Sequence, residues 1–194
     1  MIVGVAFMSL HRARGRFQEW WSLATWETCG APPQAMSREI KSGGHGKQCP
    51  VAFCDRVMAY REGEKFGHEC PDAVTDDHRL PRSLGGVNEE WCLVAMCNEC
   101  NRILGQMLNE GCFQEYGGVS KVPFRKLIEF VDFQYLVSSK SFSEKDFPEL
   151  SRRFKEKKSR VSQTRLTKNE VGESQGLAGS LISEISNQAE EVIS

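Results

Sequence analysis

Two short segments of the sequence carry side chains whose types and spacing can do chemistry. Asp77 and His78 are adjacent, and they join a carboxylate, which suits a hard divalent cation, to an imidazole that can take up a proton near neutral pH. Cys97 and Cys100 form a C-x-x-C pair, and two thiolates at this spacing can grip one tetrahedral metal ion. These residues therefore predict a hard-cation site with a base beside it, followed by a thiolate metal site.

A single C-x-x-C pair supplies only half of a structural zinc site, so a second pair of ligands is expected. The best candidate is Cys49 with Cys54, although four residues separate them rather than two. Cys70 is a rival ligand. Weaker candidates are Cys29, Cys92, Cys112, His45 and His68. The ordinary role of a lone cysteine is that of a small buried hydrophobic side chain.

The segment VTDDHRLPRSLGG begins at Val74 and is followed by the run Cys97-x-x-Cys100-Asn101-Arg102. The DH pair, the proline, the two glycines and the C-x-x-C-N run, in this order, resemble the HNH endonuclease superfamily. The most similar subgroup has its DH segment flanked by two cysteine pairs. With the first cysteine pair the resemblance spans residues 49–105, which is under a third of the 194-residue chain.

The resemblance implies an α+β fold class, with a small ββα-metal (His-Me finger) module and a structural zinc site. The expected elements are a strand over 74–79, a loop over 81–86, a second strand over 91–95 and a helix over 97–108. Asn101 would lie one turn into that helix and face the strand that carries Asp77 and His78. Zinc would clamp the module, because so small a unit has too little core to be stable unaided.

In such nucleases a histidine deprotonates the water that attacks a phosphodiester, assisted by one divalent cation. The resemblance carries the general base over to His78 and the cation ligands to Asp77 and Asn101, with Mg²⁺ or Mn²⁺ as the catalytic cofactor beside structural Zn²⁺. It implies a metal-dependent endonuclease whose partner is DNA. Candidate phosphate contacts are Arg79, Arg82 and Arg102, because guanidinium pairs bidentately with phosphate oxygens.

Two positions depart from the pattern of the family. Its middle asparagine, which holds the loop that orients the catalytic histidine, is Cys92 here, and Asn88 lies nearby as a substitute. The lysine that often follows the C-N pair is Leu104. A catalytically degenerate, zinc-stabilised nucleic-acid-binding module is therefore the alternative function. A zinc-dependent interaction protein that docks a partner through its aromatic N-terminus is a third.

Composition, together with the family resemblance, divides the chain into four expected regions. They are an N-terminal helical and loop extension over 1–48, the nuclease module over 49–112, a helical packing segment over 113–150 and a basic-then-acidic flexible tail over 151–194. The aromatic stretch 17–26 predicts a helix, and the glycines of 42–46 predict a loop. Apolar residues at near-helical spacing predict a packing helix over 123–137, with its proline in the first turn.

The tail changes sign along its length. Residues 152–168 carry eight lysines and arginines against one glutamate, whereas residues 169–194 carry five glutamates and no basic residue. Because no aromatic residue follows Phe154, we expect disorder or transient helix from about residue 155. The basic part is either a flexible arm for the DNA backbone or a solvated charged face.

The composition fits a globular chain, with 40% hydrophobic residues, 26% charged residues and a net charge of -1. Any nucleic-acid surface must therefore come from local clustering of basic residues. No segment reaches the roughly 18 apolar residues that would predict a membrane span. Eight cysteines then indicate metal binding in a reducing cytoplasm, with a bacterial or phage-like origin by resemblance. A double-strand cut by one such site would need a homodimer or sequential nicking.

Overall fold

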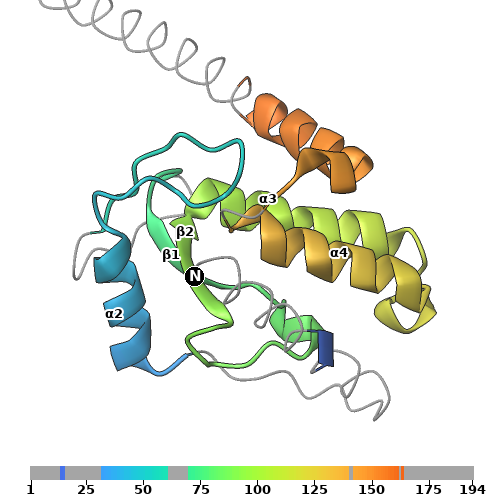
Figure 1. The fold of residues 1–194 in the computed structure, drawn as a ribbon, viewed down its shortest axis with the longest axis horizontal. Coiled ribbons are helices and arrows are strands. Elements are labelled where there is room, and N and C mark those ends of the chain that lie inside the picture. Colours follow the sequence, from blue (N-terminus) through green and yellow to red (C-terminus); the bar gives the residue numbers. More distant parts are fainter. Residues whose placement is uncertain (1–13, 16–31, 61–69, 140–141, 162, 164–194) are drawn as a thin grey trace, which may run out of the picture. The chain divides into compact units, whose positions relative to one another are not determined.

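The computed structural model describes residues 14–15, 32–60, 70–139, 142–161 and 163. The chain divides into two units, residues 1–155 and residues 156–194. The first unit has an α+β fold, as expected, with helices around a two-stranded sheet (Figure 1). The described part of the second unit is helical. The helix expected over 17–26 lies outside the described residues.

The sheet consists of two short antiparallel strands. β1 (Val74–His78) pairs with β2 (Leu93–Cys97), so that His78 lies opposite Leu93 and Val74 opposite Cys97. β2 begins two residues later than expected, because the amides of Cys92 and Leu93 both bond to the carbonyl of Glu89 in a turn. α3 (Asn98–Leu108) follows β2 directly, and this helix confirms the one expected over 97–108.

α2 (Gln34–Gly44) packs on one face of the sheet. The loop expected over 42–46 is wrong up to Gly44, because the helix continues through both of its first glycines. A Cβ at Gly44 would lie only 2.8 Å from the Cβ of Ala95 and 3.0 Å from Cγ1 of Val74. The second glycine therefore lets the helix approach the sheet, and it does not mark a chain reversal.

The two faces of β1 meet different helices. On one face Lys41 of α2 forms an ion pair with Asp76, with 3.0 Å between Nζ and Oδ1. On the other, Asn101 of α3 donates from Nδ2 to Oγ1 of Thr75 at 3.1 Å. Because alternate residues of a strand point to opposite faces, Thr75 and Asp77 share the face that meets α3.

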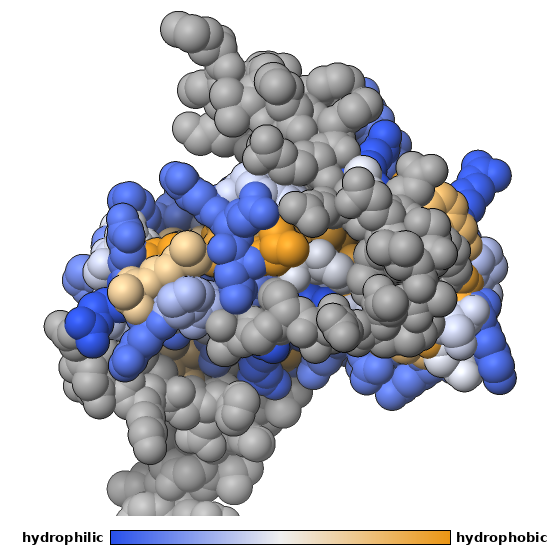
Figure 2. Space-filling view, turned by 90° about the horizontal axis from the view of Figure 1, so that it is seen from below, coloured by the Kyte–Doolittle hydropathy of each residue, from blue (hydrophilic) through white to orange (hydrophobic). Residues whose placement is uncertain are grey.

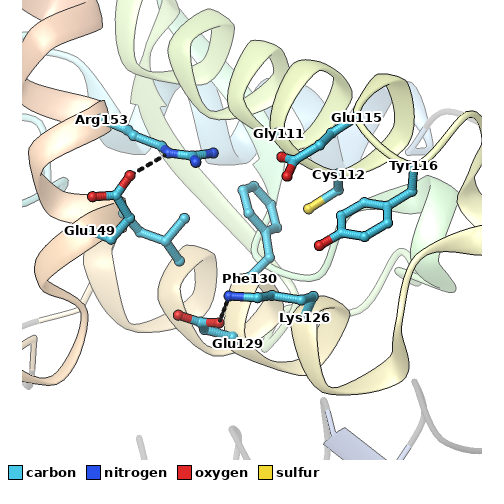
Figure 3. A pocket seen from close by; sticks show the side chains of 10 residues that line it. Gly111, Cys112, Glu115, Tyr116, Lys126, Glu129, Phe130, Glu149 and Arg153 are labelled. Atoms are coloured by element: carbon cyan, nitrogen blue, oxygen red, sulfur yellow. Dashed lines mark hydrogen bonds and ion pairs between the residues drawn. The ribbon is translucent and has the colours of Figure 1, made fainter.

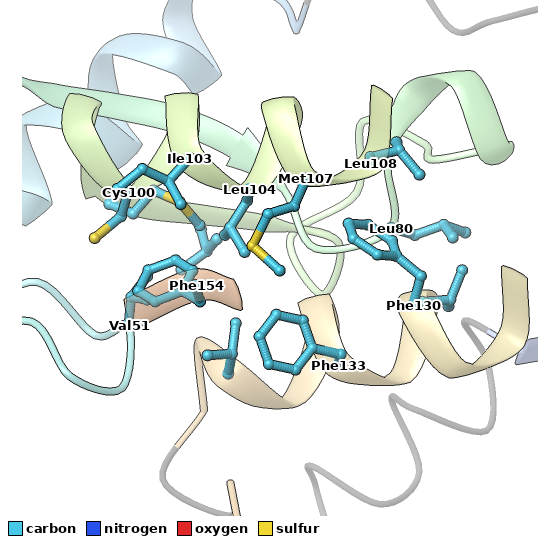
Figure 4. Packing of buried hydrophobic residues seen from close by; sticks show 14 of the residues in the cluster. Val51, Leu80, Cys100, Ile103, Leu104, Met107, Leu108, Phe130, Phe133 and Phe154 are labelled. Carbon is cyan, nitrogen blue, oxygen red and sulfur yellow. The ribbon is translucent and has the colours of Figure 1, made fainter. Parts of the chain in front are cut away.

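The hydrophobic core lies between α3 and α4 (Phe124–Val137), and α4 confirms the packing helix expected over 123–137. Figure 4 shows the side chains that interdigitate there, among them Ile103, Leu104, Met107, Phe130, Phe133 and Phe154. Phe154 belongs to a helix that begins at Pro148 and continues to Val161. This helix covers the first residues of the segment expected to be disordered or transiently helical, and residues 164–194 lie outside the described residues.

Short helical turns connect these elements. They are the 3-10 helices η1 (Arg82–Leu84), η3 (Val119–Lys121) and η4 (Glu144–Asp146), and the π-helix η2 (Asn109–Gln114) that extends α3. Hydrophilic residues dominate the described surface in Figure 2, where smaller apolar areas lie between them. Within the described ranges, no helix has a long enough apolar stretch to cross a membrane.

The close contact of α2 with the sheet can be tested with its two neighbouring glycines. We expect Gly44→Ala to lower the free energy of unfolding by about 1–3 kcal/mol, because the added methyl group overpacks the contact. Gly43→Ala is the matched control, since a Cβ there meets nothing within 4 Å. The control should leave stability unchanged or raise it by up to about 1 kcal/mol. Urea unfolding of the zinc-loaded variants measures both, and equal stabilities would contradict the packing.

Candidate functional site

Four buried cysteines, Cys49, Cys54, Cys97 and Cys100, bring their sulfur atoms within 4.8 Å of one another. The Sγ atoms of Cys54 and Cys97 are 3.8 Å apart, and zinc bound at about 2.3 Å by four thiolates would space them by about 3.8 Å. The backbone amide of Cys97 also donates to Sγ of Cys49 at 3.5 Å. The four cysteines are thus positioned to bind a metal ion, as a structural zinc site requires.

The four thiols interact with one another, and an ion pair lies close to them in the sequence. The contact with Cys100 is the largest that lowers the pKa of Cys54, and the contact with Cys49 is the largest that raises the pKa of Cys100, so the four thiols share their protons unevenly. Glu99, between the second pair of ligands, is 2% exposed, and its Oε2 lies 2.8 Å from Nη2 of Arg56. Because Arg56 follows the first ligand pair, this ion pair ties the two ligand segments together beside the metal site.

The rival metal ligands are placed elsewhere. Cys70 is outside the cluster, and its carbonyl accepts a hydrogen bond from Nδ2 of Asn98 at 3.2 Å. His45 accepts through Nδ1 from the backbone amide of Tyr60 at 3.0 Å. Cys92 and Cys112 are buried apart from the four cysteines, and Cys29 and His68 lie outside the described residues. Cys49 and Cys54, the pair expected to complete the ligand set, are therefore the two that lie in the cluster.

Asp77, His78 and Asn101 line one open pocket of about 340 Å³. The remaining lining residues are Pro81, Arg82, Ser83, Gly105, Leu108, Asn109, Phe113 and Gln134. The pocket therefore takes its walls from the end of β1, the loop after it, one side of α3 with η2, and α4. It brings together the three residues expected to do the chemistry and one of the three expected phosphate contacts.

His78 ends β1 with its side chain buried. Its Nε2 lies 3.0 Å from Oδ1 of Asn88, and its carbonyl accepts a hydrogen bond from Nε2 of Gln134 at 3.1 Å. Because an amide oxygen only accepts, Nε2 carries the proton and Nδ1 is the nitrogen that can take one up. Desolvation lowers the pKa of His78, so its imidazole is neutral at neutral pH.

Asp77 and Asn101 bring to the pocket the two oxygen groups expected to bind the cation. The amide of Asn101 is oriented by its bond to Thr75, whose hydroxyl in turn donates to the carbonyl of Met96 at 3.0 Å. These two hydrogen bonds engage Nδ2 of Asn101 and leave Oδ1 as the atom that could bind a cation. Burial raises the pKa of Asp77 to about 7, and a cation beside the carboxyl would favour the charged form. A carboxylate and an amide oxygen suit Mg²⁺, which keeps several waters.

The loop after β1 has a conformation that requires glycine at two positions. Gly85 is in the left-handed region with φ 88°, and a Cβ at Gly86 would lie 2.0 Å from the carbonyl oxygen of Leu80. The buried thiol of Cys92 donates to the same carbonyl at 3.7 Å. The loop is thereby closed on itself, and it carries Asn88 to the end of β1.

The three arginines expected to contact phosphate lie in different surroundings. Arg79 is half-buried, with its guanidinium 5.5 Å from the ring centroid of Tyr135 and Nη1 3.4 Å from the carbonyl of Ser138. It packs against α4 and does not line the pocket. Arg82 lines the pocket, and Arg102 is exposed on α3. Contact of any of them with DNA stays a prediction.

Gln134 and Gly105 are among the pocket residues that were not identified from the sequence. Gln134 is a polar residue inside the apolar run of α4, and such a position commonly indicates a buried hydrogen bond. Gly105 lies inside α3, where glycine costs helix stability and therefore usually has a packing or functional reason. Both signals are local, but neither indicates which partner or pocket the residue faces.

A second, smaller hollow of about 100 Å³ lies beside η2 and α4 (Figure 3). Its charged groups pair with one another, because Lys126 is 3.1 Å from Glu129 and Arg153 is 2.8 Å from Glu149. Burial raises the pKa of the Cys112 thiol in its wall to about 11, so this thiol is protonated at neutral pH. This thiol is therefore a weak nucleophile at neutral pH.

No protein-family model, curated protein or solved structure matches this chain. The metal site is therefore assigned from the geometry of the four thiols. The pocket is assigned from its lining residues and their hydrogen bonds.

The ligand set predicts one zinc ion per chain, and its removal should unfold the first unit because the metal joins segments far apart in sequence. We expect Cys97→Ser to lose the zinc and to lower the melting temperature sharply. Cys70→Ser is the matched control and should keep both, since its thiol is outside the cluster. Metal analysis by mass spectrometry with thermal unfolding measures the pair. Zinc retained in Cys97→Ser but lost in Cys70→Ser would reverse the assignment.

Proposed function

We propose that this chain is a metal-dependent endonuclease of the HNH type that hydrolyses phosphodiester bonds of DNA. His78 is the general base, and Asp77 and Asn101 are the ligands of a catalytic Mg²⁺ or Mn²⁺. The zinc site formed by the cysteines is structural and takes no part in the reaction. Arg82, in the wall of the pocket, and Arg102, on the exposed side of α3, are the proposed phosphate contacts.

The observation that carries this proposal is the convergence of a base and two oxygen ligands on one pocket. Asp77 and His78 come from a strand end, and Asn101 comes from the first turns of the following helix. Each is held by a further hydrogen bond or by burial, so the group is ordered before any ligand arrives. Preorganised groups of this kind are what catalysis by positioning requires.

Each residue has a distinct part in the hydrolysis. His78 takes a proton from the attacking water through Nδ1, while Asn88 holds the opposite ring nitrogen. Arg82 neutralises charge on the phosphate as the substrate binds. The divalent cation, when bound, supplies charge stabilisation for the phosphate and the departing oxygen. The carboxylate of Asp77 and the amide oxygen of Asn101 would hold that cation in the pocket.

The alternative function is a zinc-stabilised module that binds DNA without cutting it, and the cysteine at position 92 favours it. The asparagine expected there by resemblance is absent, although Asn88 and Cys92 each make a hydrogen bond near the base. The two functions differ in one measurable respect, which is turnover of a phosphodiester. A third function, docking of a protein partner, predicts no affinity for DNA.

We expect His78→Ala to lower the rate of plasmid cleavage by roughly 10²–10⁴-fold, which is the usual contribution of a general base. The assay uses zinc-loaded protein with and without added Mg²⁺ or Mn²⁺, and the zinc content is measured in each sample. His45→Ala is the matched control, since this exposed histidine is outside the pocket. Wild-type protein that binds DNA but never cleaves it would support the degenerate module.

The contact between His78 and Asn88 predicts a smaller effect. Asn88→Ala should lower kcat by roughly 10- to 100-fold, because it disturbs the orientation of the base. KM should change little, because the proposed phosphate contacts stay in place. Zinc content and melting temperature should stay close to those of the wild type. An unchanged kcat would show that the imidazole is held without this hydrogen bond.

A further inference from the structure

One side of the pocket has a composition that phosphate hydrolysis alone does not explain. Asn101, Gly105, Asn109 and Phe113 recur at every fourth position and all line the pocket. An α-helix has 3.6 residues per turn, so residues four apart are rotated gradually around its axis. The π-helix η2 has a wider turn, which rotates the last of these residues back toward the same side. The stripe therefore leads from the cation ligand Asn101 to an aromatic ring.

Gly105 is the position in this stripe that points most directly to a ligand. It lies inside α3, where glycine costs up to about 1 kcal/mol relative to alanine. A Cβ there would meet nothing within 4 Å, so no neighbouring group requires the glycine. Its φ is also not in the left-handed region. What the missing side chain does leave is space in the pocket, about 6 Å along the helix from Asn101.

A second observation comes from the opposite wall. The Oε1 atom of Gln134 is buried and has no hydrogen-bond partner among the described residues, while the residue itself is 4% exposed and lines the pocket. An unsatisfied buried acceptor is costly, and an N–H group of a nucleobase in the pocket would satisfy it once the side chain turns toward the ligand. Asn109 adds a further amide to the lining, and Phe113 and Leu108 add apolar surface.

We propose that this side of the pocket accepts an unpaired nucleobase next to the scissile phosphate, stacked on Phe113 and seated over Gly105. The inference rests on the proposed function, because the phosphate is placed by the cation ligands and Arg82. A base within a continuous duplex is stacked and paired, so it enters such a pocket only after it is extruded. The preferred substrate is therefore a DNA strand that is single-stranded or locally unpaired at the cut.

Binding tests the pocket separately from cleavage. Zinc-loaded His78→Ala protein with Mg²⁺ is titrated with labelled oligonucleotides by fluorescence anisotropy. The probes are a single strand of thymidines, the same strand with abasic units at its centre, and a continuous duplex. We expect the intact strand to bind roughly 5- to 150-fold more tightly than the abasic strand, which is the usual contribution of one stacked base. The duplex should also bind more weakly than the intact strand.

Substitutions within α3 identify the site of the base. Gly105→Leu, introduced in the same background, should abolish the preference for the intact strand, because its side chain fills the pocket while favouring the helix. Gln106→Leu is the matched control, since Gln106 is exposed on α3 outside the pocket, and it should keep the preference. Equal affinity for the intact and abasic strands, or an unchanged preference in Gly105→Leu, would overturn the inference. Failure of the wild type to cleave would overturn only the proposed nuclease.

Discussion

The rest of the first unit depends on one constraint, which is the contact between two pairs of cysteines. Cys49 and Cys54 lie in one segment, and they meet Cys97 and Cys100 at the junction of β2 and α3. Cys97 ends β2 and Cys100 lies in the first turn of α3, so a metal ion bound by the four thiols would fix the direction in which the helix leaves the sheet. Asn101 follows immediately. The cysteine cluster, together with the hydrogen bond from Asn101 to Thr75, sets the position of Asn101. This position lies beside β1, the strand that carries the proposed cation ligand Asp77.

A buried polar contact links the core to the pocket. α4 packs against α3 through Phe130 and Phe133, and apolar packing of this kind tolerates small shifts of a helix along its axis. The hydrogen bond from Gln134 to the carbonyl of His78 is less tolerant, because a buried amide without a partner is costly. The apolar residues thus stabilise the position of α4, and this one amide specifies its register against the end of β1.

Features that depend on local spacing could be predicted from the sequence, whereas features that depend on distant contacts could not. The cysteine ligands, both strands, α3 and α4 all follow from spacing or from the motif. Gly44 was taken for part of a loop, because only the close approach of α2 to the sheet explains a glycine there. The contact of Arg79 with the ring of Tyr135 on α4 could not be predicted either. Charge alone does not reveal which ring or carbonyl a guanidinium meets.

The departure at Cys92 has a physical account that bears on the two competing functions. By resemblance, one asparagine both holds the loop after the catalytic histidine and helps to orient that histidine. In this chain the thiol of Cys92 bonds to the carbonyl of Leu80 and closes the loop, while Asn88 contacts the ring of His78. Two residues therefore do what the resemblance assigns to one. Loss of the asparagine does not by itself imply loss of an oriented base, and the degenerate module gains little support from it.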